Sequence, residues 1–267
     1  MKVMTSVAIL LVCVIGLLSL GSRAASRNDV VLTAKNSLVF SGPVSASSVA
    51  KNQKKLAEIS NELGSNDVIY LVIDSPGGSV LAGLEFITFA KALPQKVKPL
   101  CLYCASMGYQ IFQALDERLV LPSSQLMSHR ATLGGIGGQI PGEIDSRLNS
   151  IRRILDEIDS GTAARVGMSF EQYRKAIYNE LYLWGREAVE QKHADRMPIV
   201  RCSKELANSV RQETFNTFFG AVSVEFSNCP LISGPLSVKL NRTDITVPEV
   251  EVHRAVMKQL RTITMEF

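Results

Sequence analysis

Excess charge of either sign is scarce in this chain of 267 residues. The formal charge is +4, and Lys2 and Arg23 supply +2 of it within a first 25 residues that hold no acid. A remainder so close to neutral excludes a protein held to nucleic acid by charge alone, because phosphate binding needs clustered cations. Low-complexity tracts are absent too, and 46% apolar against 20% charged residues excludes global disorder. The chain can therefore bury a sizeable core, as one large domain or as one domain with an appendage.

Long apolar runs are also rare, and the only one that approaches a membrane span extends from Val7 to Leu20. Lys2 precedes it, and the small residues Ser22 and Ala24 after it suit a signal-peptidase site. We therefore expect residues 1–25 to be a secretory signal peptide. An uncleaved N-terminal anchor is the alternative, because the run is at the short end of lengths that cross a bilayer. Either way, the protein is expected to be exported, to the periplasm or the cell exterior, with membrane contact only through its N-terminus.

Cysteine is limited to five residues, and Cys13 belongs to the N-terminal segment. The others are Cys101, Cys104, Cys202 and Cys229. In an exported domain these thiols are candidates for disulfides. We favour Cys202–Cys229, which would pin a C-terminal segment, whereas the spacing of Cys101 and Cys104 on a predicted strand does not favour a bridge. A zinc site is disfavoured because the three histidines are scattered, so no metal or other cofactor is expected.

Apolar strand-like runs alternate with helical segments along most of the chain. Strands are predicted at 37–40, 68–73, 100–103, 118–121 and 126–128, and helices at 46–63, 80–93, 106–115, 142–165 and 170–178. Gly64 is expected to cap the first helix and Ser169 the last. Strands and helices joined by short connections predict right-handed crossovers and a layered α/β fold.

The final part of the chain, residues 200–267, differs in character. It holds two cysteines, Pro230 and Pro235, and short alternating runs at 221–224 and 244–247. These features predict a small, disulfide-stapled C-terminal extension that contains β-strands, with a closing helix at 250–261. The main domain would then occupy residues 26–199.

Three short segments place reactive residue types at the ends of predicted elements. Ser106 lies at a strand-to-helix turn, where the helix N-terminus helps a developing oxyanion. Pro-Gly-Gly at 76–78 follows the buried strand and can present free N–H groups to a ligand. His129 ends another strand, on a path that can return the chain beside the serine. Each of these three features has a more common structural interpretation when taken alone: Ser106 as a helix N-cap, Pro-Gly-Gly as a tight turn and His129 as a structural histidine. His193 is expected to lie at a solvated helix end.

The same segments resemble a known family. Asp-Ser-Pro-Gly-Gly-Ser-Val at 74–80, Cys-Ala-Ser-Met-Gly at 104–108 and Leu-Met-Ser-His at 126–129 resemble the three active-site blocks of the Clp protease proteolytic subunit (ClpP-like serine peptidase) family. The likeness spans residues 37–197. It implies a crotonase/ClpP-like layered α/β fold of repeated ββα units, with a catalytic domain over 26–199.

Carried over residue by residue, the resemblance implies a nucleophile at Ser106 and a general base at His129. The backbone N–H groups of Gly78 and Met107 would form the oxyanion hole.

The third triad residue departs from the family pattern. The family has an aspartate at the place that aligns with Glu180, and Asn179 stands one residue before it. A glutamate can orient an imidazole and stabilise its charged form, as in Glu-containing triads on other folds. An asparagine could hold the tautomer without supplying charge. Glu180 is therefore our first choice and Asn179 our second.

The resemblance implies an exported serine peptidase that hydrolyses peptides or unfolded proteins through an acyl-enzyme. No ATP is expected outside the membrane, so it would act without an ATP-driven unfoldase. The altered glycine-rich stretch 134–138 suggests a homo-oligomer smaller than the family's double ring. Two alternatives are a peptidase resembling signal peptide peptidase A, which uses a Ser–Lys pair, and a catalytically inactive ClpP-like oligomeric binding scaffold.

Overall fold

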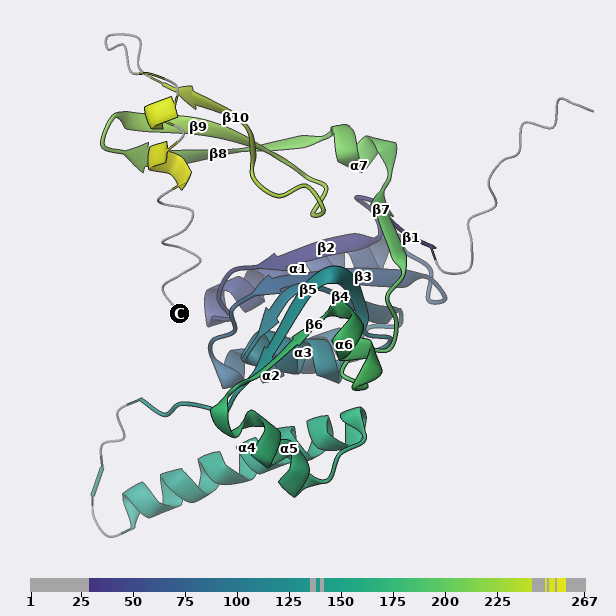
Figure 1. Ribbon diagram of the computed structural model, residues 1–267, viewed down its shortest axis with the longest axis vertical. Helices are drawn as coiled ribbons and strands as arrows, with labels where there is room; N and C mark the ends of the chain where they lie inside the picture. Colours follow the sequence, from purple (N-terminus) through teal and green to yellow (C-terminus); the bar gives the residue numbers. More distant parts are fainter. Residues whose placement is uncertain are drawn as a thin grey trace, which may run out of the picture.

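The computed structural model describes residues 29–134, 138–139, 142–241, 248, 250–252 and 254–257. Its main sheet has five strands in the order β2-β3-β4-β5-β6 (Figure 1), of which the first four are parallel and β6 is antiparallel. Their bounds are β2 (Ser37–Ser41), β3 (Val68–Ser75), β4 (Lys96–Ala105), β5 (Leu119–Ser128) and β6 (Leu181–Trp184). The predicted mixed α/β fold is confirmed.

Helices connect these strands and form two groups in Figure 1. α1, α2 and α3 lie along the sheet, whereas α4 and α5 lie together beyond it, at the lower end of the view. The bounds are α1 (Ala46–Glu62), α2 (Val80–Lys91), α3 (Met107–Ala114), α4 (Glu143–Val166), α5 (Phe170–Ala176), the 3-10 turn η1 (Ile177–Asn179) and α6 (Gly185–Glu190). None of the helices in the described ranges is long and apolar enough to cross a membrane. The apolar run at 7–20 lies outside those ranges.

Both faces of the sheet are buried, and β3 shows how. Side chains alternate along a strand, so Leu71 and Ile73 pack in the core on the side of α1, α2 and α3. Val72 packs on the other face with Val30 and Leu32. These two residues belong to β1 (Asp29–Leu32), which pairs in parallel with β7 (Ile199–Cys202). The continuous apolar run in β3 is therefore explained by burial on both sides.

The C-terminal extension forms its own three-stranded antiparallel sheet in the order β10-β9-β8. Its elements are α7 (Lys204–Asn208), β8 (Val210–Thr217), β9 (Gly220–Ser227) and β10 (Pro235–Leu240). The predicted strand at 221–224 is part of β9, whereas the one at 244–247 lies outside the described residues. Residues 250–252 and 254–257 are helical, as predicted. The boundary predicted between residues 199 and 200 falls inside β7, and the division into domains stays a prediction.

The disulfide Cys202–Cys229 is confirmed, because the two sulfurs are at bonding distance. The expectation against a Cys101–Cys104 bridge is wrong, since these sulfurs are also at bonding distance, with a Cα–Cα separation of 5.8 Å. In a regular strand, residues three apart point to opposite faces. Here the pairing of β4 with β5 is irregular after Cys101, and this local distortion brings the two buried side chains together.

The same irregularity corrects the strand prediction for β5. Residues 118–121 and 126–128 were expected as two strands, but a single strand runs from Leu119 to Ser128. The pairing with β4 jumps from Val120 to Gln125, so the intervening residues form a bulge within one strand. The expected C-cap at Gly64 is also wrong, because α1 ends earlier, and the N–H of Gly64 donates instead to the Asp67 carboxylate at 2.8 Å. The Ser169 cap of α5 is confirmed.

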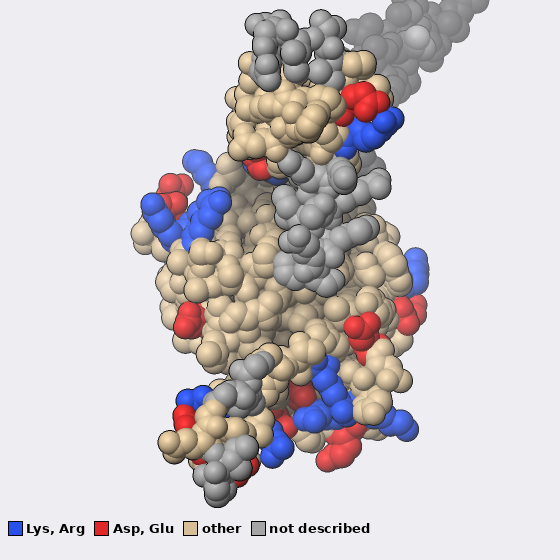
Figure 2. Space-filling view, turned by 90° about the vertical axis from the view of Figure 1, so that its left-hand side faces the viewer, with Lys and Arg blue, Asp and Glu red and all other residues tan. Residues whose placement is uncertain are grey.

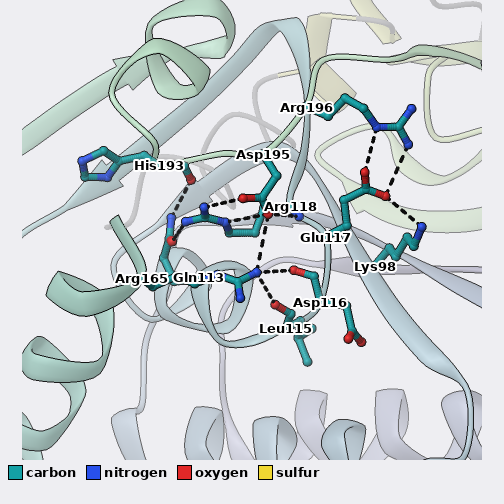
Figure 3. Close-up of polar contacts among 10 residues, drawn as sticks. All are labelled: Lys98, Gln113, Leu115, Asp116, Glu117, Arg118, Arg165, His193, Asp195 and Arg196. Carbon is teal, nitrogen blue, oxygen red and sulfur yellow. Dashed lines mark hydrogen bonds and ion pairs between the residues drawn. The ribbon is translucent and has the colours of Figure 1, made fainter. Parts of the chain in front are cut away.

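A buried polar network fixes the turn after α6 against α3 and β5 (Figure 3). The Arg118 guanidinium is 3% exposed and donates to both carboxylate oxygens of Asp195, at 2.6 and 3.0 Å. It also contacts the side-chain oxygen of Gln113, whose Nε2 donates to the His193 carbonyl at 2.8 Å. His193 is 0% exposed, and its Nδ1 lies 2.6 Å from the Tyr109 hydroxyl. The expectation that His193 is solvated is wrong, because the chain turns inward after α6 to reach this network.

The buried His193 predicts a specific pH dependence of stability. Burial, helped by the positive charge of Arg118, lowers the pKa of His193 from 6.5 to about 4. The unfolded chain therefore takes up the proton first as the pH falls. The free energy of unfolding should be at its full value above pH 6.5 and decline as the pH falls toward 4, by about 3 kcal/mol in total.

Urea unfolding at pH 7, 6 and 5 checks this expectation. The variant His193→Gln cannot titrate, so its stability should change much less than that of the native protein between pH 7 and 5. Parallel curves for the two proteins in that window would contradict the prediction.

Candidate active site

Ser106 alone forms the turn between β4 and α3. Its backbone has φ 52° and ψ −119°, a conformation that residues other than glycine rarely adopt. Its hydroxyl does not cap α3 and has no hydrogen bond within the described residues, so the simple N-cap interpretation is wrong. Only three non-glycine residues in the described chain have positive φ, and they are Ser106, Glu180 and Lys192. Two of the three are predicted catalytic residues, and backbone strain tends to gather at functional sites.

The Pro-Gly-Gly turn packs directly against this serine. A Cβ on Gly77 would lie 2.6 Å from the Cβ of Ser106 and 2.7 Å from the backbone nitrogen of Met107, so only glycine fits. A Cβ on Gly78 would lie 2.4 Å from the carbonyl oxygen of Val44, which pairs with the turn in an isolated bridge. Among the described residues, the N–H groups of Gly78 and Met107 have no acceptor. Both are therefore available to an oxyanion.

The end of β5 brings His129 toward Ser106. Ala105 pairs with Met127 in the parallel ladder of β4 and β5, and the Ser106 N–H donates to the Met127 carbonyl at 2.9 Å. His129 follows two residues later, just past the end of β5. It is half-buried. The serine and the histidine thus stand at the carboxyl ends of adjacent strands.

β6 brings the candidate third residue to the same edge of the sheet. Ser128 at the end of β5 pairs with Leu181 at the start of β6. Because this pair is antiparallel, continuing the register by one residue places Glu180 opposite His129. The Glu180 side chain is exposed and accepts a hydrogen bond from the Tyr182 hydroxyl at 3.1 Å.

The predicted residues are therefore gathered at one edge, but they do not form a hydrogen-bonded triad. Among the described residues, neither the Ser106 hydroxyl nor the His129 ring has a hydrogen-bond partner. Asn179 is exposed at the end of η1, one residue short of the register position opposite the histidine. The roles of Ser106, His129, Glu180 and Asn179 stay predictions.

Behind this edge lies a buried tyrosine that the sequence analysis missed. The Tyr173 hydroxyl is 2.8 Å from the Ser128 Oγ and accepts a hydrogen bond from the Gln110 Nε2 at 3.3 Å. Burial raises the pKa of Tyr173, so its hydroxyl stays neutral. From the sequence, Tyr173 is predicted only to be an apolar position of a short helix. No motif in the neighbouring residues distinguishes it from an ordinary core residue.

A pocket of about 540 Å³ opens between α4, α5 and the residue after His129. It is lined by Arg130, Asp156, Phe170, Glu171, Arg174, Lys175 and Tyr178. Figure 2 shows that charged side chains of both signs gather at this end of the molecule. Arg174 pairs with Asp156 at 2.9 Å, and Arg130 stacks on the Tyr178 ring, so much of this charge is already engaged. In the described part of the chain, no group of three or more His, Cys, Asp or Glu side chains could hold a metal ion.

Comparison with known proteins identifies relatives of the chain. The family model described as Clp protease matches residues 22–197. The ATP-dependent Clp protease proteolytic subunit 2 of Prochlorococcus marinus (strain MIT 9313) is 36% identical over 132 residues, 48% of this chain and 66% of that protein. The corresponding subunit 2 of strain MIT 9312 is 35% identical, and the alignment covers 48% of this chain and 64% of that protein. Subunit 3 of Synechococcus sp. (strain CC9902) is 32% identical over 136 residues, 50% of this chain and 68% of that protein. The chain thus spans slightly less than two thirds of the two Prochlorococcus proteins.

Proposed function

The chain belongs to the Clp protease family, and on that premise we propose that it is a serine peptidase that forms an acyl-enzyme at Ser106. The observation that carries the proposal is the strained turn that withholds the Ser106 hydroxyl from helix capping. Gly77 packs against this turn, and two N–H groups that have no acceptor within the described ranges adjoin it. Backbone strain of this kind persists only where the surrounding contacts enforce it. This is consistent with a serine whose hydroxyl is kept free to act as a nucleophile.

In the proposed reaction, His129 takes the proton of the Ser106 hydroxyl as its oxygen attacks the peptide carbonyl. The N–H groups of Gly78 and Met107 donate to the oxyanion of the tetrahedral intermediate. Protonated His129 then gives the proton to the leaving amine, and the C–N bond breaks to leave the acyl-enzyme. Water, deprotonated by the same imidazole, releases the acid and restores the serine. Glu180 would orient the imidazole and stabilise its charged form.

We also propose that the peptidase is exported and acts without an ATP-driven unfoldase. Two cysteine pairs at bonding distance support an oxidising compartment, because disulfides are rare in the cytosol. Substrates there would be peptides or loosely folded chains. We expect a homo-oligomer by analogy with the family. Residues 1–25, on which export depends, lie outside the described residues.

A second candidate is the inactive ClpP-like binding scaffold. One observation favours it: the Glu180 carboxylate accepts a hydrogen bond from the Tyr182 hydroxyl, so it is engaged by a residue outside the proposed triad. In this function, the sheet edge would bind chains without cutting them.

A fluorophosphonate probe distinguishes the two functions. We expect one phosphonate adduct per chain on Ser106, located by peptide mass mapping of the folded full-length protein. Heat-unfolded protein serves as the control and should not react, because the adduct requires an assembled oxyanion hole and base. A folded preparation that forms no adduct would contradict the peptidase and favour the scaffold. An adduct on another serine would contradict the assigned nucleophile.

A further inference from the structure

The hydroxyl of Tyr173 connects three elements around the candidate active site. Tyr173 lies in α5, is 0% exposed, and is held 2.8 Å from the Ser128 Oγ in β5 and 3.3 Å from the Gln110 Nε2 in α3. Ser128 is itself buried. A buried hydroxyl that has partners in separate elements fixes the positions of those elements relative to one another.

On the side of the nucleophile, the connection runs through Gln110. Its backbone N–H donates to the Ser106 carbonyl at 3.2 Å, so it belongs to the first turn of the helix that Ser106 opens. Its side-chain amide is held at both ends, because Oε1 accepts from Thr162 of α4 at 2.6 Å while Nε2 donates to Tyr173. The orientation of the amide is therefore defined, and a shift of the tyrosine would act on the first turn of α3.

On the side of the base, the connection runs through Ser128. This residue ends β5 and immediately precedes His129, so the position of its backbone also sets that of His129. The segment from Tyr173 through η1 to Leu181 is clamped onto Ser128 at both ends. At one end the tyrosine hydroxyl meets the serine hydroxyl, and at the other Leu181 pairs with Ser128 in the sheet. Glu180 lies within this clamped segment.

From these contacts we propose that Tyr173 is a positioning residue, which holds His129 and the Glu180 segment in place relative to Ser106. The proposal rests on the peptidase function proposed above. Tyr173 is buried behind the sheet edge, so it would act on the rate of the chemical step and not on substrate binding. A displacement of about 1 Å at a catalytic group can lower a rate about 100-fold.

The test measures the reaction of the folded full-length protein with a fluorophosphonate, separating the maximal inactivation rate constant from the probe concentration at half-maximal rate. Tyr173→Phe keeps the ring and removes only the hydroxyl. We expect it to lower the rate constant by about 10- to 100-fold, with the half-maximal concentration unchanged. Ser128→Ala removes the other partner of the same hydrogen bond and should act in the same direction. The two substitutions together should be less than additive, because either one already breaks the bond.

Ser60→Ala is the matched control. It also removes a buried serine hydroxyl, one that donates to Gln95 at 2.6 Å between α1 and the segment before β4, away from the sheet edge. Its rate constant should equal that of the native protein. Combined with Tyr173→Phe, it should leave the effect of that substitution unchanged.

The outcomes separate the proposals. If native protein reacts and Tyr173→Phe reacts at the same rate constant, with only the folded fraction reduced, the tyrosine is merely structural and the positioning role is overturned. Fully additive effects of Tyr173→Phe and Ser128→Ala would also overturn it. If Tyr173→Phe does not fold, Ser128→Ala alone decides, by the same rate criterion. If folded native protein forms no adduct, both the peptidase and the positioning role fail.

Discussion

Alanine at His129 is expected to slow peptide hydrolysis by about 10⁴- to 10⁶-fold, as is alanine at Ser106. Without the imidazole, the serine hydroxyl keeps its proton and remains a weak nucleophile. Because the two groups act as a unit, the double variant should be no slower than either single one. Substrate affinity should change little, since both side chains are assigned to the chemical step.

Hydrolysis of a mixed fluorogenic peptide library by folded, size-matched preparations measures this effect. Ser203→Ala is a suitable control: Ser203 is a genuine helix cap, accepting the Leu206 N–H at 3.2 Å in the extension. It should lose some helix stability and keep the native rate. Activity that survives His129→Ala would contradict the Ser–His assignment and favour a Ser–Lys pair of the signal peptide peptidase A kind.

Alanine at Gly185 is expected to destabilise the fold by about 3 kcal/mol or more. Gly185 opens α6 directly after β6, and a Cβ there would lie 1.9 Å from the carbonyl oxygen of Leu121 and 3.1 Å from the Cα of Pro122. These are backbone atoms of the β5 bulge, so no side chain can rotate away to relieve the clash. The midpoint of thermal unfolding should fall by about 10 °C.

Gly161→Ala provides the matched control, because a Cβ at Gly161 in α4 would meet nothing within 4 Å. Alanine in an open helix interior is favourable, so this variant should gain about 0.5–1 kcal/mol. Thermal and urea unfolding of the two variants measure the difference. A midpoint for Gly185→Ala equal to or above that of Gly161→Ala would show that α6 can move off the bulge at little cost.

Much of the fold was predictable because most elements carry their own hydrophobic period. The helix at 46–62 and the strand at 68–75 are recognisable from their residues alone. β5 was not, since Pro122 and the two serines after it interrupt the apolar pattern, and only pairing with β4 shows them to be a bulge. β1 was not predicted, because a strand of four residues is too short to show a clear hydrophobic pattern. It is defined only by its pairing with β7, which lies far along the chain.

The residues of the candidate site likewise include some that the sequence predicts and some that it does not. Ser106, the glycine turn at 77–78 and His129 each end an apolar run, so sequence reasoning finds them. The residues that support them are joined across long separations: Tyr173 bonds to partners 45 and 63 residues away, and His193 to one 84 residues away. Contacts of this kind produce no local hydrophobic periodicity in the sequence. A polar segment such as the one around His193 is therefore predicted to be solvated, although the fold buries it.

The Cys202–Cys229 bond closes a covalent ring that contains α7, β8 and all of β9, because it joins residues 27 apart. The tip of the β8–β9 hairpin lies inside that ring and carries Phe218, which is 99% exposed. A cut at this tip would open the ring without releasing a fragment, since both new ends stay tied through the sulfurs. The extension can therefore be nicked by a protease and still remain attached to the rest of the chain, as long as the disulfide stays oxidised.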